Sequence, residues 1–171
     1  MPVADPLKWN GVEFGDIMNH GFKHGVAAYL QAVNAPLKTI EEVIAFNELD
    51  VEARAPNGMG RMRKASGNTW LAGEYASRVA QARTHARAVV REVMQEHHAD
   101  ILVSFSQSGV GPHFVLAGAP LLSVPAGYLP TGEPYGITFA GAPFDDCKLL
   151  AAGFAFERMM PPRREPALRD I

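Results

Sequence analysis

Hydrophobic side chains recur at helical spacing in the first part of the chain. Between residues 10 and 33 they are separated by steps of three and four, which places them on one stripe of a helix. The members of this stripe are Phe14, Met18, Phe22, Val26, Tyr29, Leu30 and Val33. Residues 70–98 repeat the spacing from Tyr75 to Met94 and form the longest predicted helix. Both helices are expected to bury these stripes.

Shorter elements lie between the two long helices. The sequence Thr39-Ile40-Glu41-Glu42 has the S/T-x-x-E spacing of a capping box, so a short helix is expected to begin there and to end near Asn47. Residues 50–68 contain Pro56, several glycines and asparagines, and the basic run Arg61–Lys64. This composition is typical of a mobile connector, and its basic run is interpreted as a solvated loop.

Short apolar runs replace the helical periodicity after residue 100. They predict buried strands at residues 101–105, 121–124 and 135–140, with a short helix at residues 113–117. Asp145 is placed to cap a last helix, which Pro161-Pro162 ends. Helices followed by a strand-rich half predict an α/β fold, in which a small mixed sheet is covered by helices. One domain is expected over residues 1–160, with a disordered tail at 161–171.

Composition and charge exclude several classes of protein. The chain has 171 residues, 47% hydrophobic and 20% charged, with a formal net charge of −2. Nothing in this balance favours binding to nucleic acid or to an anionic membrane. No apolar run approaches the roughly 18 residues of a membrane span, and the N-terminal residues lack a signal-peptide pattern. With Cys147 as its single cysteine, the chain is expected to be cytoplasmic.

One group of residues has the spacing of metal ligands. Asp16, His20 and His24 are separated by four residues each and could align on a helix. On a helical wheel, however, they lie nearly opposite the predicted apolar stripe. A solvated face is therefore the favoured interpretation, and neither a metal nor a cofactor is expected.

The candidate nucleophiles lie in the second half of the chain. The loop at residues 106–112, SQSGVGP, matches neither a phosphate-binding loop nor a nucleophile elbow. A serine nucleophile needs a neighbouring base, and His113 is the only histidine of the strand-rich half. A pair of His113 with one nearby serine stays open; the serines are Ser104, Ser106, Ser108 and Ser123. Cys147 is interpreted as structural, because the adjacent Asp145 and Asp146 oppose a thiolate.

Five short blocks in the second half carry a resemblance to a known family. They are Ala117-Gly118-Ala119-Pro120, Ser123-Val124-Pro125-Ala126-Gly127, Gly132-Glu133-Pro134-Tyr135-Gly136, Gly141-Ala142-Pro143-Phe144 and Ala155-Phe156-Glu157. In type and order they resemble the C-terminal portion of the amidase signature family. The helix from Ala27, followed by Pro36 to Glu48, fits the same family more loosely. The resemblance thus covers most of this chain but only the last part of the family's length.

The resemblance implies amide hydrolysis by a Ser–cis-Ser–Lys triad, which the family carries upstream in a Gly/Ser-rich signature. This sequence has no GGSSGG-like stretch, and no lysine in it matches the family's base. No residue is therefore assigned a catalytic role. The portion that is present implies sheet strands and loops that close one side of a substrate pocket for a small amide. The candidates for lining that pocket are Ser106, Gln107, His113 and Phe114.

Three hypotheses about function follow. The chain is an amidase-like segment that is inactive alone, a subunit of a split amidase completed by a partner with the triad, or an unrelated α/β domain that binds small molecules. Whether it is an enzyme stays open. An isolated segment would carry an unpaired strand edge and an apolar face. We therefore expect a homo-oligomer, a partner chain that covers the edge, or poor solubility.

Overall fold

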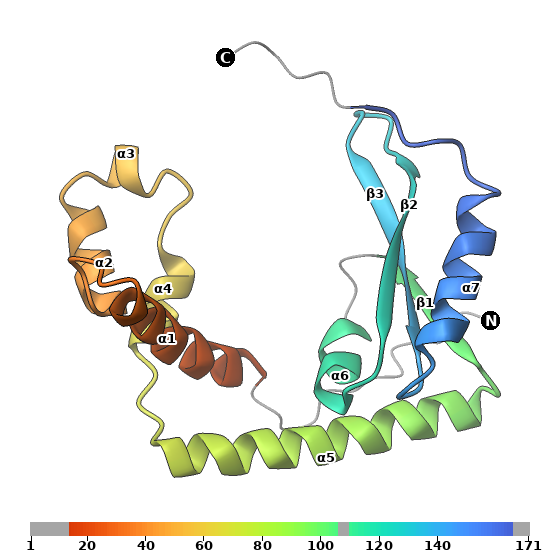
Figure 1. The fold of residues 1–171 in the computed structure, drawn as a ribbon, viewed down its shortest axis with the longest axis horizontal. Helices are drawn as coiled ribbons and strands as arrows, with labels where there is room; N and C mark the ends of the chain where they lie inside the picture. Colours follow the sequence, from red (N-terminus) through yellow and green to blue (C-terminus); the bar gives the residue numbers. More distant parts are fainter. Residues whose placement is uncertain (1–13, 106–109, 166–171) are drawn as a thin grey trace. The chain divides into compact units, whose positions relative to one another are not determined.

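The computed structural model describes residues 14–105 and 110–165. The chain divides into two compact units, with the boundary between Gln81 and Ala82 inside one long helix. The α/β class is confirmed, since helices dominate the first unit and a sheet with helices makes up the second (Figure 1). The single domain expected over residues 1–160 stays a prediction.

The first unit is helical throughout. Its elements are α1 (Phe14–Ala32), α2 (Ile40–Glu48), α3 (Val51–Arg54), α4 (Gly60–Ser66) and the beginning of α5 (Ala72–Glu96). The capping box is confirmed at the start of α2, where the Thr39 hydroxyl accepts the Glu42 backbone N–H at 3.2 Å. The carboxylate of Glu42 reaches back to the backbone N–H of Lys38 at 2.6 Å, one residue before the cap.

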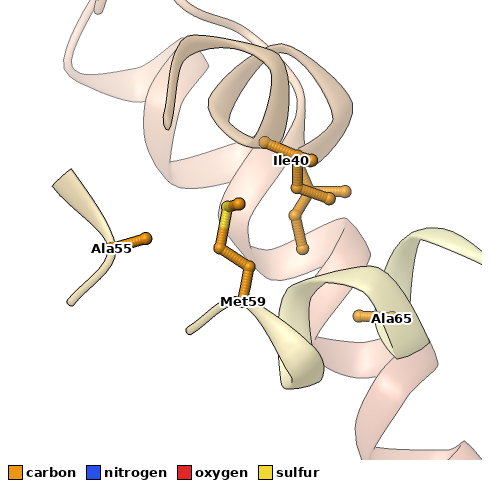
Figure 2. Close-up of a cluster of buried hydrophobic side chains, with 5 residues drawn as sticks. Ile40, Ala55, Met59 and Ala65 are labelled. Carbon is orange, nitrogen blue, oxygen red and sulfur yellow. The ribbon is translucent and has the colours of Figure 1, made fainter. Parts of the chain in front are cut away.

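The connector predicted at residues 50–68 is instead largely helical. Asp50 caps α3 by accepting the Ala53 backbone N–H at 3.2 Å. Ala55, Met59 and Ala65 are buried against α2 in the core of this unit, which Figure 2 shows. The prediction was wrong because the glycines and basic residues lie on the outside of short helices, whose few apolar residues contribute to the core. One residue of the basic run, Arg63, forms an ion pair with Glu48 at 2.8 Å.

Helix α1 buries a different face from the one its apolar stripe predicted. Met18, Phe22, Tyr29 and Val33 of that stripe are exposed, whereas Ile17 and His20 are buried. Val26 packs against the core cluster. The difference arises because the buried face uses the ring of His20 and the stem of Lys23, which the pattern counts as polar. The position of α4 against α1 therefore decided which face is covered.

A charged network ties α1, α2 and α4 together. Lys23 Nζ donates to the backbone carbonyls of Ser66 at 2.9 Å and Asn68 at 3.2 Å, and it lies 3.4 Å from a Glu41 carboxylate oxygen. The same carboxylate accepts the Ser66 hydroxyl at 2.9 Å. The pKa of Glu41 is lowered, first by its own backbone N–H, then by the Ser66 hydroxyl and by Lys23.

Glu41→Gln is expected to lower the stability of the first unit at pH 7 by at most about 1 kcal/mol, because the pair is half exposed. The lowered pKa means that the ionised carboxylate stabilises the fold above its unfolded pKa, and that this contribution is lost as the pH falls through the folded pKa. Thermal unfolding at pH 7 and at about pH 3 measures the difference. Glu52→Gln, on the surface of α3, is the control. An equal effect of Glu41→Gln at both pH values would contradict the prediction.

The second unit contains the rest of α5 and a three-stranded sheet in the order β1-β3-β2. Its elements are β1 (Ile101–Phe105), α6 (Val110–Ala117), β2 (Leu121–Tyr128), β3 (Pro134–Gly141) and α7 (Asp146–Glu157). Within the described residues the sheet is antiparallel throughout, not mixed. The reason is the short turn at Leu129–Glu133, which folds β3 back along β2 and places β3 in the centre.

Helix α7 covers one face of the sheet. Gly153 lies against Leu122 and Val124 of β2, and Phe156 makes an edge contact with Phe139 of β3 at a centroid distance of 5.7 Å. The cover does not extend to the edge strand β1, where Val103 is 57% and Phe105 is 72% exposed.

The first turn of α7 is stabilised by an ion pair and not by the expected cap. Asp145 occupies the N-cap position, but its side chain makes no capping hydrogen bond. Instead, its carboxylate lies 3.1 Å from Lys148 Nζ, which also lies 3.2 Å from Asp100. Asp145 first and then Asp100 raise the pKa of Lys148. The pair ties α7 to the turn before β1.

Candidate functional site

Three hydroxyl side chains lie in a row across the sheet of the second unit. Ser104 of β1 and Ser123 of β2 are both cross-strand partners of Thr138, the central residue of the row on β3. The Ser123 and Thr138 hydroxyls lie 2.8 Å apart and are hydrogen-bonded to each other. The Ser104 hydroxyl is buried and has no hydrogen-bond partner among the described residues. The sequence carried one signal for this row, which is the presence of a hydroxyl residue in each predicted strand.

The row does not contain an activated nucleophile. Activation of serine requires a base within hydrogen-bond reach. Ser123 is paired with a second hydroxyl, and Ser104 has no described partner, so neither is paired with His113. Ser106 and Ser108 lie outside the described residues. A Ser–His pair that involves one of them stays a prediction.

The predicted pocket residues fall into two groups. Ser106 and Gln107 lie outside the described residues. His113 and Phe114 lie on α6 and are buried, with 2% and 0% of their surface exposed. Helix α6 is held at its end by Arg87 Nε of α5, which donates to the Ala117 carbonyl at 3.2 Å. Within the second unit alone, His113 and Phe114 are core residues, and a role in lining a substrate pocket stays a prediction.

A cavity of about 1050 Å³ lies elsewhere, along the β2–β3 hairpin. Its walls are mostly apolar and come from Pro125, Tyr128, Pro134 and Tyr135 of the hairpin and from the extended residues 161–165. Ser123, at one end of the hydroxyl row, also lines it. Sequence reasoning missed this site because the tail was expected to be disordered. Residues 166–171 of that tail lie outside the described residues, so their disorder stays a prediction.

The histidines of α1 form a stacked cluster in the first unit. The ring of His20 is stacked on Tyr75 at a centroid distance of 4.2 Å and lies 4.3 Å from the ring of His24. Its Nδ1 lies 3.1 Å from Oδ1 of Asn68, which also accepts the Trp70 backbone N–H at 3.2 Å. The expectation of a solvated face was therefore wrong for His20, which is buried. The cluster positions the segment between α4 and α5.

No metal site accompanies these histidines in the part of the chain that the structure describes, since no three His, Cys, Asp or Glu side chains are grouped to hold an ion. Cys147 is exposed in the first turn of α7. Among the described residues, no helix is long and apolar enough to cross a membrane.

The fold has close counterparts among solved structures. The chain superposes over 95% of its length on an amidase family protein from Bacillus anthracis, with a TM-score of 0.79 and 31% sequence identity, and it covers 32% of that protein. It also superposes on a peptide amidase from Stenotrophomonas maltophilia, with a TM-score of 0.75 and 24% identity, over 36% of that chain. The second likeness shows the fold alone.

Sequence relatives point the same way. A protein of Arabidopsis thaliana named "Probable amidase" is 29% identical over 160 residues, which are 85% of this chain and 29% of the relative. A shorter match joins the chain to a glutamyl-tRNA(Gln) amidotransferase of Desulforudis audaxviator, of which one polypeptide is 51% identical over 43 residues, or 25% of this chain. The resemblance to the amidase signature family is confirmed, although no family model matches the chain.

The amidase homology bears on the three hypotheses. It contradicts the idea of an unrelated α/β domain, because relatives and structural neighbours agree over most of the chain. The chain spans about a third or less of the length of these amidases. The remaining hypotheses differ in whether the rest of the amidase fold is supplied by a partner.

Proposed function

We propose that this chain is an amidase-like segment that forms one supporting part of an amide hydrolase and does not hydrolyse amides by itself. One observation carries the proposal. The fold matches 95% of this chain to only 32% of an amidase family protein, and the sequence contains no GGSSGG-like serine signature. The hydroxyls that the second unit does present are a hydrogen-bonded pair and an isolated buried group, and neither arrangement activates a nucleophile.

The purified chain is expected to show no hydrolysis of simple amides and aryl amides above the buffer rate. An active amidase assayed in parallel confirms that the panel of substrates is suitable. The result that would overturn the proposal is turnover by the chain alone that is lost on replacement of Ser104 or Ser106 by alanine. Such a loss would identify a nucleophile, and its pH profile would report whether His113 is the base.

A second candidate function is that of one half of a split amidase. The observation that favours it is the uncovered edge of the sheet, where Val103 and Phe105 of β1 are exposed. Exposed apolar side chains on an unpaired edge strand are a template for a partner strand. The partner would carry the serines and lysine of the triad, and Phe105 would be buried between the two chains.

The test for a partner compares two substituted chains in an extract of the organism that encodes them. Amidase activity that elutes with the tagged chain is expected to be lost with Phe105→Asp and kept with Val115→Asp. Val115 is the matched control, because it is an exposed apolar residue of α6 away from the edge strand. Activity that elutes equally with both variants would exclude β1 as the contact.

A further inference from the structure

The cavity along the β2–β3 hairpin is built on a preformed platform. A bulge between Pro125 and Gly127 shifts the register of β2 against β3. Gly127 has a φ of 141°, and a Cβ at this position would lie 3.2 Å from the hydroxyl and 3.3 Å from a ring carbon of Tyr135. Because glycine leaves this space empty, the Tyr135 ring lies close against the backbone of β2. The hairpin therefore presents an aromatic and proline-rich wall without rearrangement.

The chain's own residues 161–165 lie along this wall and are held by one tyrosine. The Tyr128 hydroxyl accepts the backbone N–H of Arg164 at 2.9 Å and donates to the backbone carbonyl of the same residue at 3.2 Å. The Arg164 guanidinium lies 3.8 Å from the centroid of the Tyr128 ring. Two hydrogen bonds require only an extended backbone, whereas the cation–π contact selects arginine.

The two prolines before Arg164 give the segment its extended form. Pro161 and Pro162 lack backbone N–H groups and have a fixed φ, so they end α7 and cannot continue as a strand. Both prolines line the cavity together with Tyr128 and Tyr135. Grooves that combine aromatic rings and prolines bind extended proline-containing peptides, whose backbone has little conformational freedom to lose. All residues from Pro161 to Glu165 are exposed, so the segment lies on the surface and is not part of the core.

We infer that the β2–β3 groove is a peptide-docking site for an extended segment with two prolines and a following arginine, and that Pro161–Glu165 occupies it within the same chain as an exchangeable strap. The occupant is defined by its chemistry, which is a proline pair against the tyrosine wall and an arginine over Tyr128. Because the strap is tethered, its effective concentration at the groove is on the order of millimolar, and it excludes a free peptide of equal affinity.

The test uses the full chain and a labelled peptide with the sequence of residues 160–165, Met-Pro-Pro-Arg-Arg-Glu. Arg164→Pro removes both the N–H donor and the guanidinium from the strap while it leaves the groove unchanged. Fluorescence anisotropy or chemical-shift titration is expected to show the peptide binding to Arg164→Pro with an affinity at least about tenfold higher than to the wild type. Equal affinity for both proteins, or no binding to Arg164→Pro, would overturn the inference.

Two further variants separate the contributions of the groove. In the Arg164→Pro background, Tyr128→Phe removes the hydroxyl and keeps the ring, so weaker but measurable binding is expected. Tyr128→Leu in the same background removes the ring and is expected to abolish binding, with folding checked by circular dichroism. A peptide with both prolines replaced by alanine is the matched ligand control. Undiminished binding of that peptide, or binding that persists in Tyr128→Leu, would count against the proposed recognition.

Discussion

Gly153→Leu is expected to destabilise the second unit by roughly 3 kcal/mol or more, because the added side chain has no space between α7 and the sheet. A Cβ on Gly153 would already lie 2.5 Å from Cδ2 of Leu122 and 3.4 Å from Cγ1 of Val124. The helix therefore has to lift off β2, which exposes Leu149 as well. Thermal unfolding should show a decrease in Tm of about 4–8 °C for each kcal/mol lost.

Two control variants distinguish crowding from a change in helix propensity. Gly153→Ala gains about 1 kcal/mol of propensity and loses a similar amount to crowding, since the end of Leu122 can rotate away. Its Tm is expected to stay within a few degrees of wild type. Ala151→Leu places the same side chain on the exposed side of α7 and is expected to be close to neutral. If Gly153→Leu unfolded no earlier than Ala151→Leu, α7 would not pack against β2 through Gly153.

Phe114→Ala is expected to cost about 3–5 kcal/mol, which is the usual loss for a fully buried aromatic residue. Phe114 lies on α6 with 0% of its surface exposed, so its removal leaves a cavity that α6 and β2 can only partly close. Denaturation in urea should shift the midpoint to lower concentration with an unchanged slope, because the surface exposed on unfolding stays similar.

The neighbouring residue provides the control for Phe114. Val115 lies on an exposed side of the same helix, and Val115→Ala is expected to change stability by less than about 0.5 kcal/mol. Comparable losses for the two variants would mean that α6 is not packed on the sheet as described. A loss of less than about 1 kcal/mol for Phe114→Ala would exclude Phe114 from the core.

Much of the fold could be predicted from local sequence. The helix over residues 70–98, the capping box at Thr39 and the three strands were confirmed, with β2 and β3 longer than expected. These features depend on spacing and on side chains that act within a few residues, so the chain itself carries the information. The five sequence blocks carried the amidase resemblance in the same local way, and the relatives confirmed it.

The candidate site was less accessible to sequence reasoning. Of the four predicted pocket residues, His113 and Phe114 are core residues of the second unit, and the cavity is formed by residues far apart in the chain. Tyr128 and Arg164 are separated by 36 positions, and no periodicity relates them. The hydroxyl row likewise depends on the register of three strands, which the turn and the bulge determine together.

The sequence alone determined which segments of the second half are helical or extended, and which family they resemble. The tertiary structure decided which faces are buried. His20 is buried and Met18 is exposed on the same helix, because the packing of α4 favours a face of mixed chemistry over the most apolar one. Likewise, Asp145 pairs with Lys148 in place of capping its helix, and residues 161–165 lie against Tyr128. Periodicity is a property of one segment, whereas burial depends on the neighbour that covers it.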